Sequence, residues 1–216
     1  MFVFDSPEKS GGSRGRTGRV ARPPRQPSGS APYVELHCHS SFSFLDGASS
    51  PLELASRAAS LGYAALALTD HDGLWGSMEF AVACKGAGIR PITGAELTVS
   101  DKGRDFHLTL LVENQVGYGN LCRLLTAAHA GTRDSPERQP GQPRLPLKDL
   151  APHAEGLICL SGCARRGLLP AAWADGDLGR GLTLGRELRR WFGPGNLWIE
   201  IQRPYWRHDQ ARNRWP

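Results

Sequence analysis

The chain has 216 residues, of which 40% are hydrophobic and 22% are charged, a balance typical of a folded globular protein. The formal net charge of +5 is unevenly placed, because residues 1–32 carry +4, residues 203–216 carry +3 and the body between them carries −2. This distribution argues against a large basic nucleic-acid groove in the body, and no apolar run reaches the roughly 20 residues of a membrane span.

The first 32 residues are predicted to form a disordered basic tail. They are rich in Gly, Ser, Pro and Arg, with almost no apolar residue after Phe4. Such a segment cannot bury enough apolar surface to offset the entropy lost on ordering. Its arginines could contact nucleic acid, but we expect a solvated tail.

The cysteines and the N-terminus indicate a reducing compartment. The chain has five cysteines, an odd number, and none of them form a CxxC pair, so an even disulfide framework is not expected. The N-terminus also lacks the apolar core of a secretory signal. We therefore predict a cytoplasmic protein without membrane contact.

The body of the chain alternates between strand and helix patterns. Residues 33–37 are predicted to form a strand, and Ser50 then has the features of an N-cap. Pro51 occupies the first helical position and Glu53 completes a capping box, so a helix is expected from here to Gly62. Further strands are predicted at residues 64–69, 91–99, 106–112, 156–160 and 197–202, and further helices at 77–87, 118–130 and 182–192.

This alternation predicts an α/β fold with a mainly parallel sheet covered by helices. The polar, Pro-rich stretch 131–146 is predicted to be a surface loop. Residues 203–216 contain neither a closing strand nor a clear helix, so we interpret them as the end of a C-terminally truncated domain.

Histidines and carboxylates stand at or near the ends of these strands. Side chains at positions i and i+2 of a strand point to the same face, so His37 and His39 can reach one metal ion while Cys38 points away. The other candidates in this pattern are Asp46, His71, Glu96 and His107. Such residues at successive strand ends predict a polynuclear metal site at the mouth of an α/β barrel.

Some of these residues have simpler interpretations. Asp46 precedes Gly47, and this pair is common in turns. His71 lies between Asp70 and Asp72, one of which could orient its imidazole rather than bind metal. His129, near a helix end, is expected on the surface.

Several segments together resemble the PHP family, the polymerase and histidinol phosphatase family. The closest similarity is to the N-terminal PHP domain of bacterial C-family DNA polymerases, in the error-prone branch of the DNA polymerase III alpha subunits. The segments that carry the resemblance are residues 35–48 (ELHCHSSFSFLDGA), 68–76 (LTDHDGLWG), 94–96 (GAE), 107–114 (HLTLLVEN), 117–125 (GYGNLCRLL) and 160–163 (LSGC). They span most of residues 33–202, which we assign as the PHP domain.

The resemblance implies a distorted seven-stranded (β/α) barrel, similar to a TIM barrel, that holds up to three divalent metals. The ligand set that it implies is His37, His39, Asp46, His71, Glu96, His107 and Cys163. Relatives supply a last ligand pair from an Asp-x-His motif late in the domain, and this sequence has no such motif after residue 107, so the barrel is expected to be incomplete. Cys159 is expected to be a buried thiol.

Mixed histidine, carboxylate and thiolate ligands suit zinc, with manganese or iron as options. Clustered divalent metals hydrolyse phosphoesters. The implied activity is therefore metal-dependent phosphoester hydrolysis, as 3′→5′ exonuclease proofreading in a polymerase, with His37, His39, His71 and Glu96 as the catalytic candidates. DNA and other replication or translesion repair components are the implied partners. The nucleotidyltransferase core of a polymerase is absent at this length.

Two alternatives remain open at this point. The first is a free-standing PHP phosphoesterase that acts on nucleotides or small phosphates. The second is a non-catalytic module that supports a polymerase. Arg165 and Arg166, which follow a predicted strand, could grip a phosphate or be a solvated pair.

Overall fold

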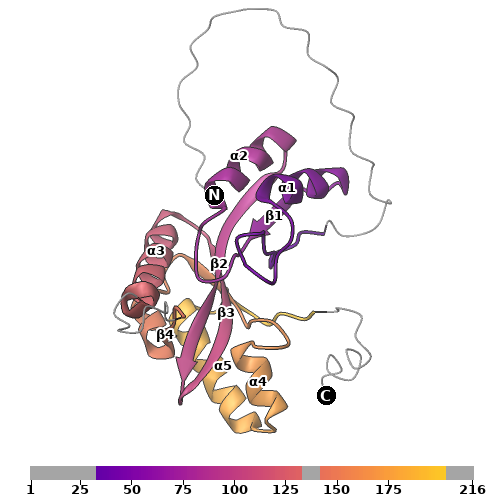
Figure 1. Ribbon diagram of the computed structural model, residues 1–216. Helices are drawn as coiled ribbons and strands as arrows, with labels where there is room; N and C mark the ends of the chain where they lie inside the picture. The colour runs from indigo at the N-terminus through magenta and orange to yellow at the C-terminus, as the bar shows by residue number, and fades with distance from the viewer. Residues whose placement is uncertain (1–32, 133–141, 203–216) are drawn as a thin grey trace, which may run out of the picture.

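The computed structural model describes residues 33–132 and 142–202, which form a mixed α/β fold (Figure 1). The predicted tail, part of the predicted loop and the predicted C-terminal end lie outside the described residues. The helices are α1 (Pro51–Ser60), α2 (Ser77–Ala87), α3 (Gln115–His129), α4 (Leu168–Ala174) and α5 (Leu178–Phe192), with short 3-10 helices at Ala130–Thr132 and Leu147–His153. The strands are β1 (Ala65–Leu68), β2 (Arg90–Asp101), β3 (Arg104–Val112), β4 (Leu145–Pro146), β5 (Leu157–Leu160) and β6 (Leu197–Trp198).

The strands form one mixed sheet in the order β1-β2-β3-β5-β6, with β4 paired to β2. The pairs β1–β2, β2–β4 and β5–β6 are parallel. The two longest strands, β2 and β3, pair antiparallel, and so do β3 and β5. The α/β class is therefore confirmed, and the sheet predicted to be mainly parallel is mixed: three of its five strand pairings are parallel, but the longest one is antiparallel.

A tight hairpin explains this difference. Lys102 and Gly103, the two residues between β2 and β3, both have left-handed backbone conformations, with φ of 50° and 77°. Two consecutive residues with positive φ make the turn that suits the twist of antiparallel strands. A two-residue link cannot make the crossover that parallel neighbours need, so β2 and β3 must pair antiparallel.

The ends of the early helices are those that the sequence predicts. Ser50 caps α1 by accepting a hydrogen bond from the Glu53 amide, and the Glu53 side chain bonds back to the Ser50 backbone. Helix α2 ends at Gly88, whose φ of 73° is the left-handed conformation that glycine adopts freely. Both termini are set by local chemistry, which makes them readable without tertiary information.

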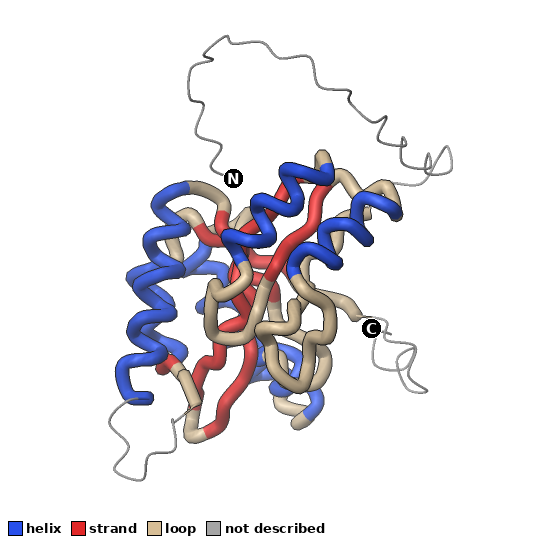
Figure 2. Tube along the Cα trace, turned by 45° about the horizontal axis from the view of Figure 1, so that its top comes forward, coloured by secondary structure: helices blue, strands red, loops and turns tan. Residues whose placement is uncertain are grey.

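The two larger of the three apolar clusters in the described residues lie on the two halves of the molecule. A small core joins α1 and α2 to β1, centred on Leu68 and Phe80. A larger core packs α3, α4 and α5 against β2, β3 and β5, with Leu108 and Leu121 fully buried. Figures 1 and 2 show the sheet running between these groups of helices. All five cysteines are free thiols, and Cys159 is fully buried in the larger core as predicted.

The sheet curls around a groove of about 1230 Å³. The residues along this groove come from both sides of the curl and are mainly apolar, among them Leu36, Ile92, Leu111, Ile158, Trp198 and Ile201. Within the described residues β1 and β6 are the two ends of the strand order and do not pair with each other. The described part of the chain is therefore an open curled sheet of six strands, and the predicted seven-stranded barrel is not seen in it.

Two predicted strands are shorter than expected. In the segment 33–37 only Glu35 pairs, through an isolated parallel bridge to Leu66. The predicted strand 197–202 is regular only at Leu197–Trp198. Both segments lie at the ends of the strand order, where a strand has at most one neighbour to hold it.

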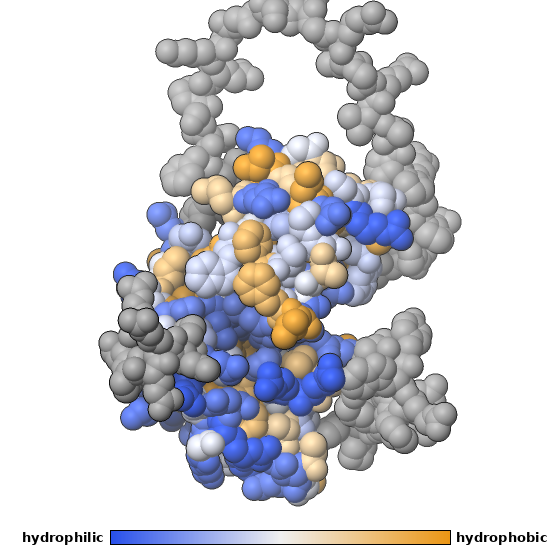
Figure 3. Space-filling model, in the orientation of Figure 1, coloured by the Kyte–Doolittle hydropathy of each residue, from blue (hydrophilic) through white to orange (hydrophobic). Residues whose placement is uncertain are grey.

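On the face drawn in Figure 3, apolar side chains lie scattered among polar ones in the upper part, and the lower part is mainly hydrophilic. Exposed apolar side chains include Phe42, Phe44, Leu45, Met78 and Val82. They belong to the loop before α1 and to α2. Among the described residues no helix combines the length and apolarity needed to cross a bilayer.

Helix α3 packs so closely on the turn before β5 that one glycine should be irreplaceable. A Cβ at Gly117 would lie 1.7 Å from the carbonyl oxygen of Gly156. This oxygen belongs to the backbone, so it cannot move aside as a flexible side chain could. We expect Gly117→Ala to lower the free energy of unfolding by more than about 2 kcal/mol, measured by urea denaturation. Gly119→Ala, whose Cβ would meet only the Arg123 side-chain end at 3.4 Å, should be neutral or slightly stabilising. Equal effects of the two changes would contradict this packing argument.

Candidate metal centre

Glu96 is the centre of the candidate site. It lies in β2 with 1% of its side chain exposed, and four imidazoles surround its carboxylate. The Nδ1 atom of His71 lies 3.1 Å from Oε1, and the Nε2 atom of His39 lies 3.7 Å from Oε2. His37 and His107 contact the same carboxylate from Nε2 and Nδ1 respectively.

Asp46 closes the outer side of this group. Its Oδ2 atom lies 3.2 Å from Nδ1 of His39 and 3.0 Å from Nε2 of His71. The Asp46 side chain is 57% exposed, whereas that of His37 is 7% exposed. The site therefore has a buried floor at Glu96 and His37 and a mouth at Asp46.

A buried carboxylate holds the loop that carries Asp46. Asp70, at the end of β1, accepts hydrogen bonds of 2.7 Å from the Ser40 amide, the Ser40 hydroxyl and the Ser43 hydroxyl. The Ser43 hydroxyl in turn accepts the His71 amide at 3.1 Å. Asp70 therefore fixes the loop of residues 40–47 against the end of β1 and does not bind the His71 imidazole.

The other carboxylate beside His71 also has an anchoring role. Asp72 adopts a left-handed backbone conformation with φ of 46° and accepts the Thr98 amide at 2.7 Å and the Thr98 hydroxyl at 2.8 Å. Its carbonyl oxygen lies 2.7 Å from Nε2 of His129. The prediction that Asp70 or Asp72 orients the imidazole is wrong, and His129 is a half-buried bonding partner rather than a free surface residue.

The pair His37 and His39 behaves as predicted, although no regular strand holds it. Both imidazoles reach Glu96, while Cys38 packs against the small core of α1, α2 and β1. The chain bends at His37, and the Cys38 amide is held by the Thr69 hydroxyl at 3.0 Å. Alternation along an extended segment is enough to separate the three side chains.

Within residues 33–132 and 142–202, three overlapping groups of side chains could each hold a metal ion. Within a group, the possible ligand atoms lie within 4.8 Å of one another. The groups are His37 with His39 and Glu96, His39 with Asp46 and His71, and His71 with Glu96 and His107. Each pair of groups shares a residue, so the ions that they suit would be close neighbours.

The buried polar atoms of the cluster fit a cation. Both carboxylate oxygens of Glu96 and the Nε2 atom of His39 are buried, and none of them makes a hydrogen bond of acceptable geometry within the described residues. Buried polar atoms without partners are costly. A divalent ion bound by nitrogen and oxygen ligands satisfies such atoms, so the donor set and its packing agree with a metal centre.

The electrostatics of the metal-free cluster are dominated by the contacts of Glu96. Burial opposes ionisation of Glu96, but the imidazoles of His107, His37, His39 and His71 outweigh it and hold the pKa of this carboxyl far below its usual range. Burial also disfavours a charged His37, yet the hydrogen bond to Glu200 and the close contact with the Glu96 carboxylate raise the pKa of His37 to about 10. The cluster is thus a carboxylate surrounded by readily protonated imidazoles.

Cys163 borders the cluster through His107. Burial would raise the pKa of the Cys163 thiol, but the hydrogen bonds from His107 and from the Arg166 amide hold it below its ordinary value. The Arg166 amide lies 3.4 Å from Sγ, and the Arg166 carbonyl accepts the His107 amide at 2.8 Å. The turn after β5 is therefore tied to the His107 part of β3.

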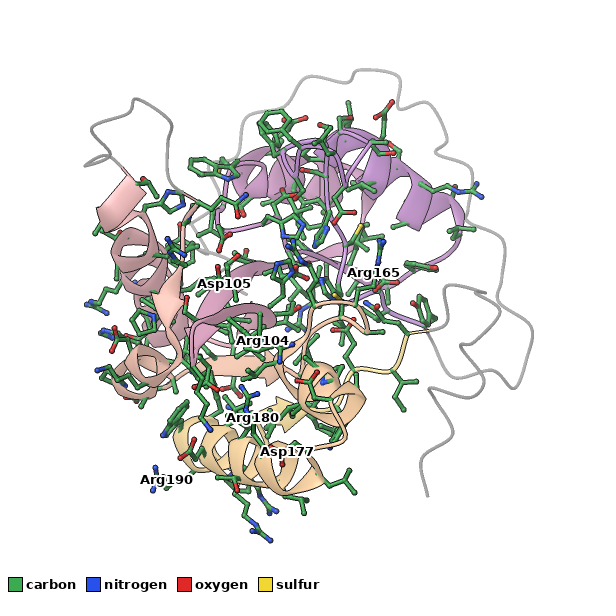
Figure 4. The ribbon with its side chains drawn as sticks, turned by 60° about the horizontal axis from the view of Figure 1, so that its bottom comes forward. Arg104, Asp105, Arg165, Asp177, Arg180 and Arg190 are labelled. Atoms are coloured by element: carbon green, nitrogen blue, oxygen red, sulfur yellow. The ribbon has the colours of Figure 1, made fainter. Side chains whose placement is uncertain are left out.

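The arginines near this region belong to two groups (Figure 4). Arg104 and Arg180 lie toward α5, where their guanidinium groups stand 5.1 and 5.6 Å from the centre of the Phe106 ring. Arg180 also pairs with Asp101 at 2.7 Å. Arg165 lies apart from them, on the exposed turn that carries Cys163. Because Cys163 borders the cluster, Arg165 is better placed than Arg104 and Arg180 to contact a ligand there.

One residue of this site was not found from the sequence. Glu200, in the segment after β6, has oxygens 2.8 and 2.9 Å from Nδ1 of His37. It lies outside every quoted motif. A strand at 197–202 would place Glu200 on the same face as Trp198 and Gln202, but it does not indicate what this face contacts. Nothing in the local pattern marks it as a partner of a residue 163 positions earlier.

The PHP domain family model matches residues 35–204 of this chain, a range that includes every residue of the cluster. The chain belongs to the PHP domain family. This PHP domain is 43% identical over 194 residues to a protein named error-prone DNA polymerase from Symbiobacterium thermophilum, and 40% identical over 181 residues to a DNA polymerase III subunit alpha from Treponema pallidum. These alignments cover 84% and 79% of the chain but only 17% and 15% of the two relatives.

Among solved structures, an amidohydrolase from Chromobacterium violaceum is 21% identical, with 83% of this chain and 96% of that chain covered and a TM-score of 0.49. This likeness is too distant to bear on the fold of the PHP domain. The resemblance predicted from the sequence motifs is thus confirmed by the family match and by the polymerase relatives.

The PHP domain brings six of the seven predicted ligands into the three groups, and Cys163 stands beside them through His107. Their roles as ligands stay predictions, because proximity alone does not establish coordination. Asp46 does sit in a turn, as its simpler interpretation proposed, since its amide bonds the Ser43 carbonyl at 3.1 Å. The turn and the contact with two imidazoles are compatible, because the turn uses the backbone and the contact uses the carboxylate.

Zinc uptake by this PHP domain should release protons. In the metal-free protein the pKa of His37 is raised to about 10, and the pKa of His107 to about 9 because bonds to Cys163 and Glu96 outweigh its burial. Both imidazoles are therefore protonated at pH 7 and must each lose a proton to bind metal. Affinity should rise between pH 6 and 9, by about tenfold per pH unit for each proton released.

Titration calorimetry of zinc into the metal-free domain, in two buffers with different ionisation enthalpies, measures the protons released. At least two protons per chain at pH 7 are expected, because contact with Glu96 also raises the pKa of His71. Zinc binding that is independent of both buffer and pH would contradict the raised pKa values.

Proposed function

We propose that this PHP domain is a metal-dependent phosphoester hydrolase at the N-terminus of an error-prone DNA polymerase alpha subunit, where it removes 3′-terminal nucleotides. The observation that carries the proposal is the convergence of four imidazoles on buried Glu96, with Asp46 across the mouth. The alignment to polymerase relatives supports the polymerase context. DNA and other replication or translesion components are the partners in this proposal, and its compartment is the cytoplasm.

The proposal assigns the seven predicted residues as ligands, with Cys163 completing the set on the His107 side. Divalent metals held there, zinc or manganese and up to three in number, would supply a hydroxide near neutral pH and a positive clamp for a phosphate. The catalytic residues of this proposal are His37, His39, His71 and Glu96, all of which belong to the three groups. Their task is to hold the ions in a dry, fixed arrangement.

The exposure of the ligands suggests where substrate enters. Asp46 and His71 form the accessible side, with 57% and 27% of their side chains exposed, whereas Glu96 is almost fully buried. A phosphoester would therefore approach over Asp46. Arg165 and Arg166 are exposed on the turn of Cys163 and can contact phosphate oxygens there, because a guanidinium matches their geometry.

The test is digestion of a 5′-labelled single-stranded DNA by the zinc- or manganese-loaded domain. We expect a ladder shortened from the 3′ end that is lost in the His37→Ala/His39→Ala variant purified in the same way. His153→Ala, a histidine outside the three groups, is the matched control and should leave the ladder unchanged.

Other outcomes would favour the alternatives. Metal bound without DNA digestion, together with hydrolysis of a small phosphomonoester, would indicate a phosphoesterase of small phosphates. Neither metal nor hydrolysis in the wild-type chain would indicate a non-catalytic module of a polymerase. His39→Ala alone would refute the proposal if it changed neither the metal content nor the hydrolysis.

A further inference from the structure

The imidazole of His37 is held between two carboxylates that lie on different sides of its ring. On the Nε2 side it contacts Glu96, in the floor of the metal centre. On the Nδ1 side it meets both oxygens of Glu200, at 2.8 and 2.9 Å. Glu96 takes part in two of the candidate metal groups, whereas Glu200 takes part in none. The two carboxylates therefore have different tasks.

Glu200 is itself held in place. Its amide donates to the Ser161 hydroxyl at 2.9 Å, and the Ser161 amide donates to the Trp198 carbonyl at 2.9 Å. The side-chain amide of Gln202 donates to Oε1 of Glu200. The side chain is 11% exposed, so the carboxylate is fixed by the end of β5 and by its own segment, and solvent competes little for it.

We propose that Glu200 is a positioning residue of the metal centre: its carboxylate accepts the Nδ1–H of His37 and so keeps the Nε2 lone pair directed at a metal held with Glu96. Neutral imidazole carries its single proton on one nitrogen only, and the partner of that nitrogen decides the tautomer. A carboxylate behind a metal-bound histidine also fixes the ring and increases its basicity. This inference rests on the metal binding that the proposed function requires.

The other group beside His37 cannot make the same choice. The Thr109 hydroxyl lies 3.3 Å from Nδ1 and 3.4 Å from Nε2, so it stands almost equally far from both nitrogens. A hydroxyl can donate or accept and therefore favours neither tautomer. Glu200, an acceptor at one nitrogen only, supplies the asymmetry.

The experiment measures zinc affinity and the His37 tautomer in the full chain. Zinc affinity is taken from competition with a chelator, and the protonation of each ring nitrogen from ¹⁵N NMR of the zinc-loaded protein labelled at histidine. In the wild type we expect His37 to carry a proton on Nδ1 and the metal on Nε2. In Glu200→Ala we expect zinc affinity to fall by about 10–100-fold and the two His37 nitrogens to lose this distinct pattern.

Two further variants serve as a conservative replacement and as a control. Glu200→Gln keeps an acceptor oxygen, so it should restore the Nδ1-protonated tautomer and most of the affinity. Glu113→Ala removes a carboxylate that lines the same groove and is bonded only to Asn196 in the described structure, and it should behave as wild type. Glu200→Gln also tests the proposal if Glu200→Ala does not fold, because it should then fold with a wild-type His37 spectrum.

The outcomes separate this inference from the proposed function. Unchanged zinc affinity and unchanged His37 nitrogens in Glu200→Ala would overturn the inference alone. Loss of one whole zinc equivalent, with the remaining affinities unchanged, would also overturn it and make Glu200 a ligand. A wild-type chain and a Glu113→Ala chain that both bind no zinc would overturn the proposed function, and the inference with it.

Discussion

Replacement of Glu96 by Gln is expected to remove most of the bound metal and to lower phosphoester hydrolysis by more than about 100-fold. Loss of a residue that only hydrogen-bonds to a metal ligand typically costs about 10–100-fold, so a larger loss is expected for a ligand itself. Glu96 belongs to two of the three candidate metal groups and contacts all four central imidazoles. A neutral amide of the same shape keeps the packing but loses the negative charge that attracts cations to the floor of the site. One substitution therefore weakens two neighbouring sites at once.

Metal per chain, measured by mass spectrometry after dialysis, checks this result. Glu79→Gln, the same change at an exposed position in the first turn of α2, is the matched control and should keep the wild-type metal content. His39 with Asp46 and His71 forms the one candidate group without Glu96, so up to one metal can remain. Full metal content in Glu96→Gln would show that the carboxylate is not a ligand.

Asp70→Ala should be the most destabilising of the substitutions near the site. It would leave the Ser40 amide and the hydroxyls of Ser40 and Ser43 without the acceptor that each of them bonds at 2.7 Å. All three groups lie in buried residues, so water cannot simply replace the carboxylate. We expect the free energy of unfolding of the metal-free domain to fall by about 3 kcal/mol or more.

Urea denaturation measures this loss, and Asp105→Ala provides its control. Asp105 is 43% exposed, pairs with Arg144 at 3.6 Å and accepts the exposed Ser100 hydroxyl at 2.6 Å. Water can replace these partners, so removal of Asp105 should cost no more than about 1 kcal/mol. Zinc affinity should also fall in Asp70→Ala, because the loop that carries Asp46 loses its anchor. A stability equal to that of Asp105→Ala would mean that the three serine groups find other partners.

Short-range features were predictable because their causes lie within a few residues. The capping box of Ser50 and Glu53 and the left-handed Gly88 define the ends of α1 and α2, and each depends on backbone groups nearby. The residue types of the candidate metal centre were also visible as separate motifs. Their chemistry is a property of the side chains, so histidines and carboxylates near strand ends are informative before any fold is known.

The strand pairing was predicted less well. The antiparallel pairing of β2 and β3 follows from the two-residue turn at Lys102 and Gly103. Lys-Gly is not one of the strong two-residue hairpin signals, and the alternation of strands and helices around it favoured a parallel sheet. A single local turn decided the direction of the two longest strands against the average pattern of the chain.

The sequence by itself determined the α/β class, the first helix ends and the residue types of the candidate metal centre. Only the tertiary structure decided that Asp70 and Asp72 anchor loops and that Glu200 stands behind His37. The physical reason is the range of the interactions. A cap or a turn is closed by neighbours in the chain, whereas the partners of a buried imidazole are those that the curl of the sheet brings to it from distant segments.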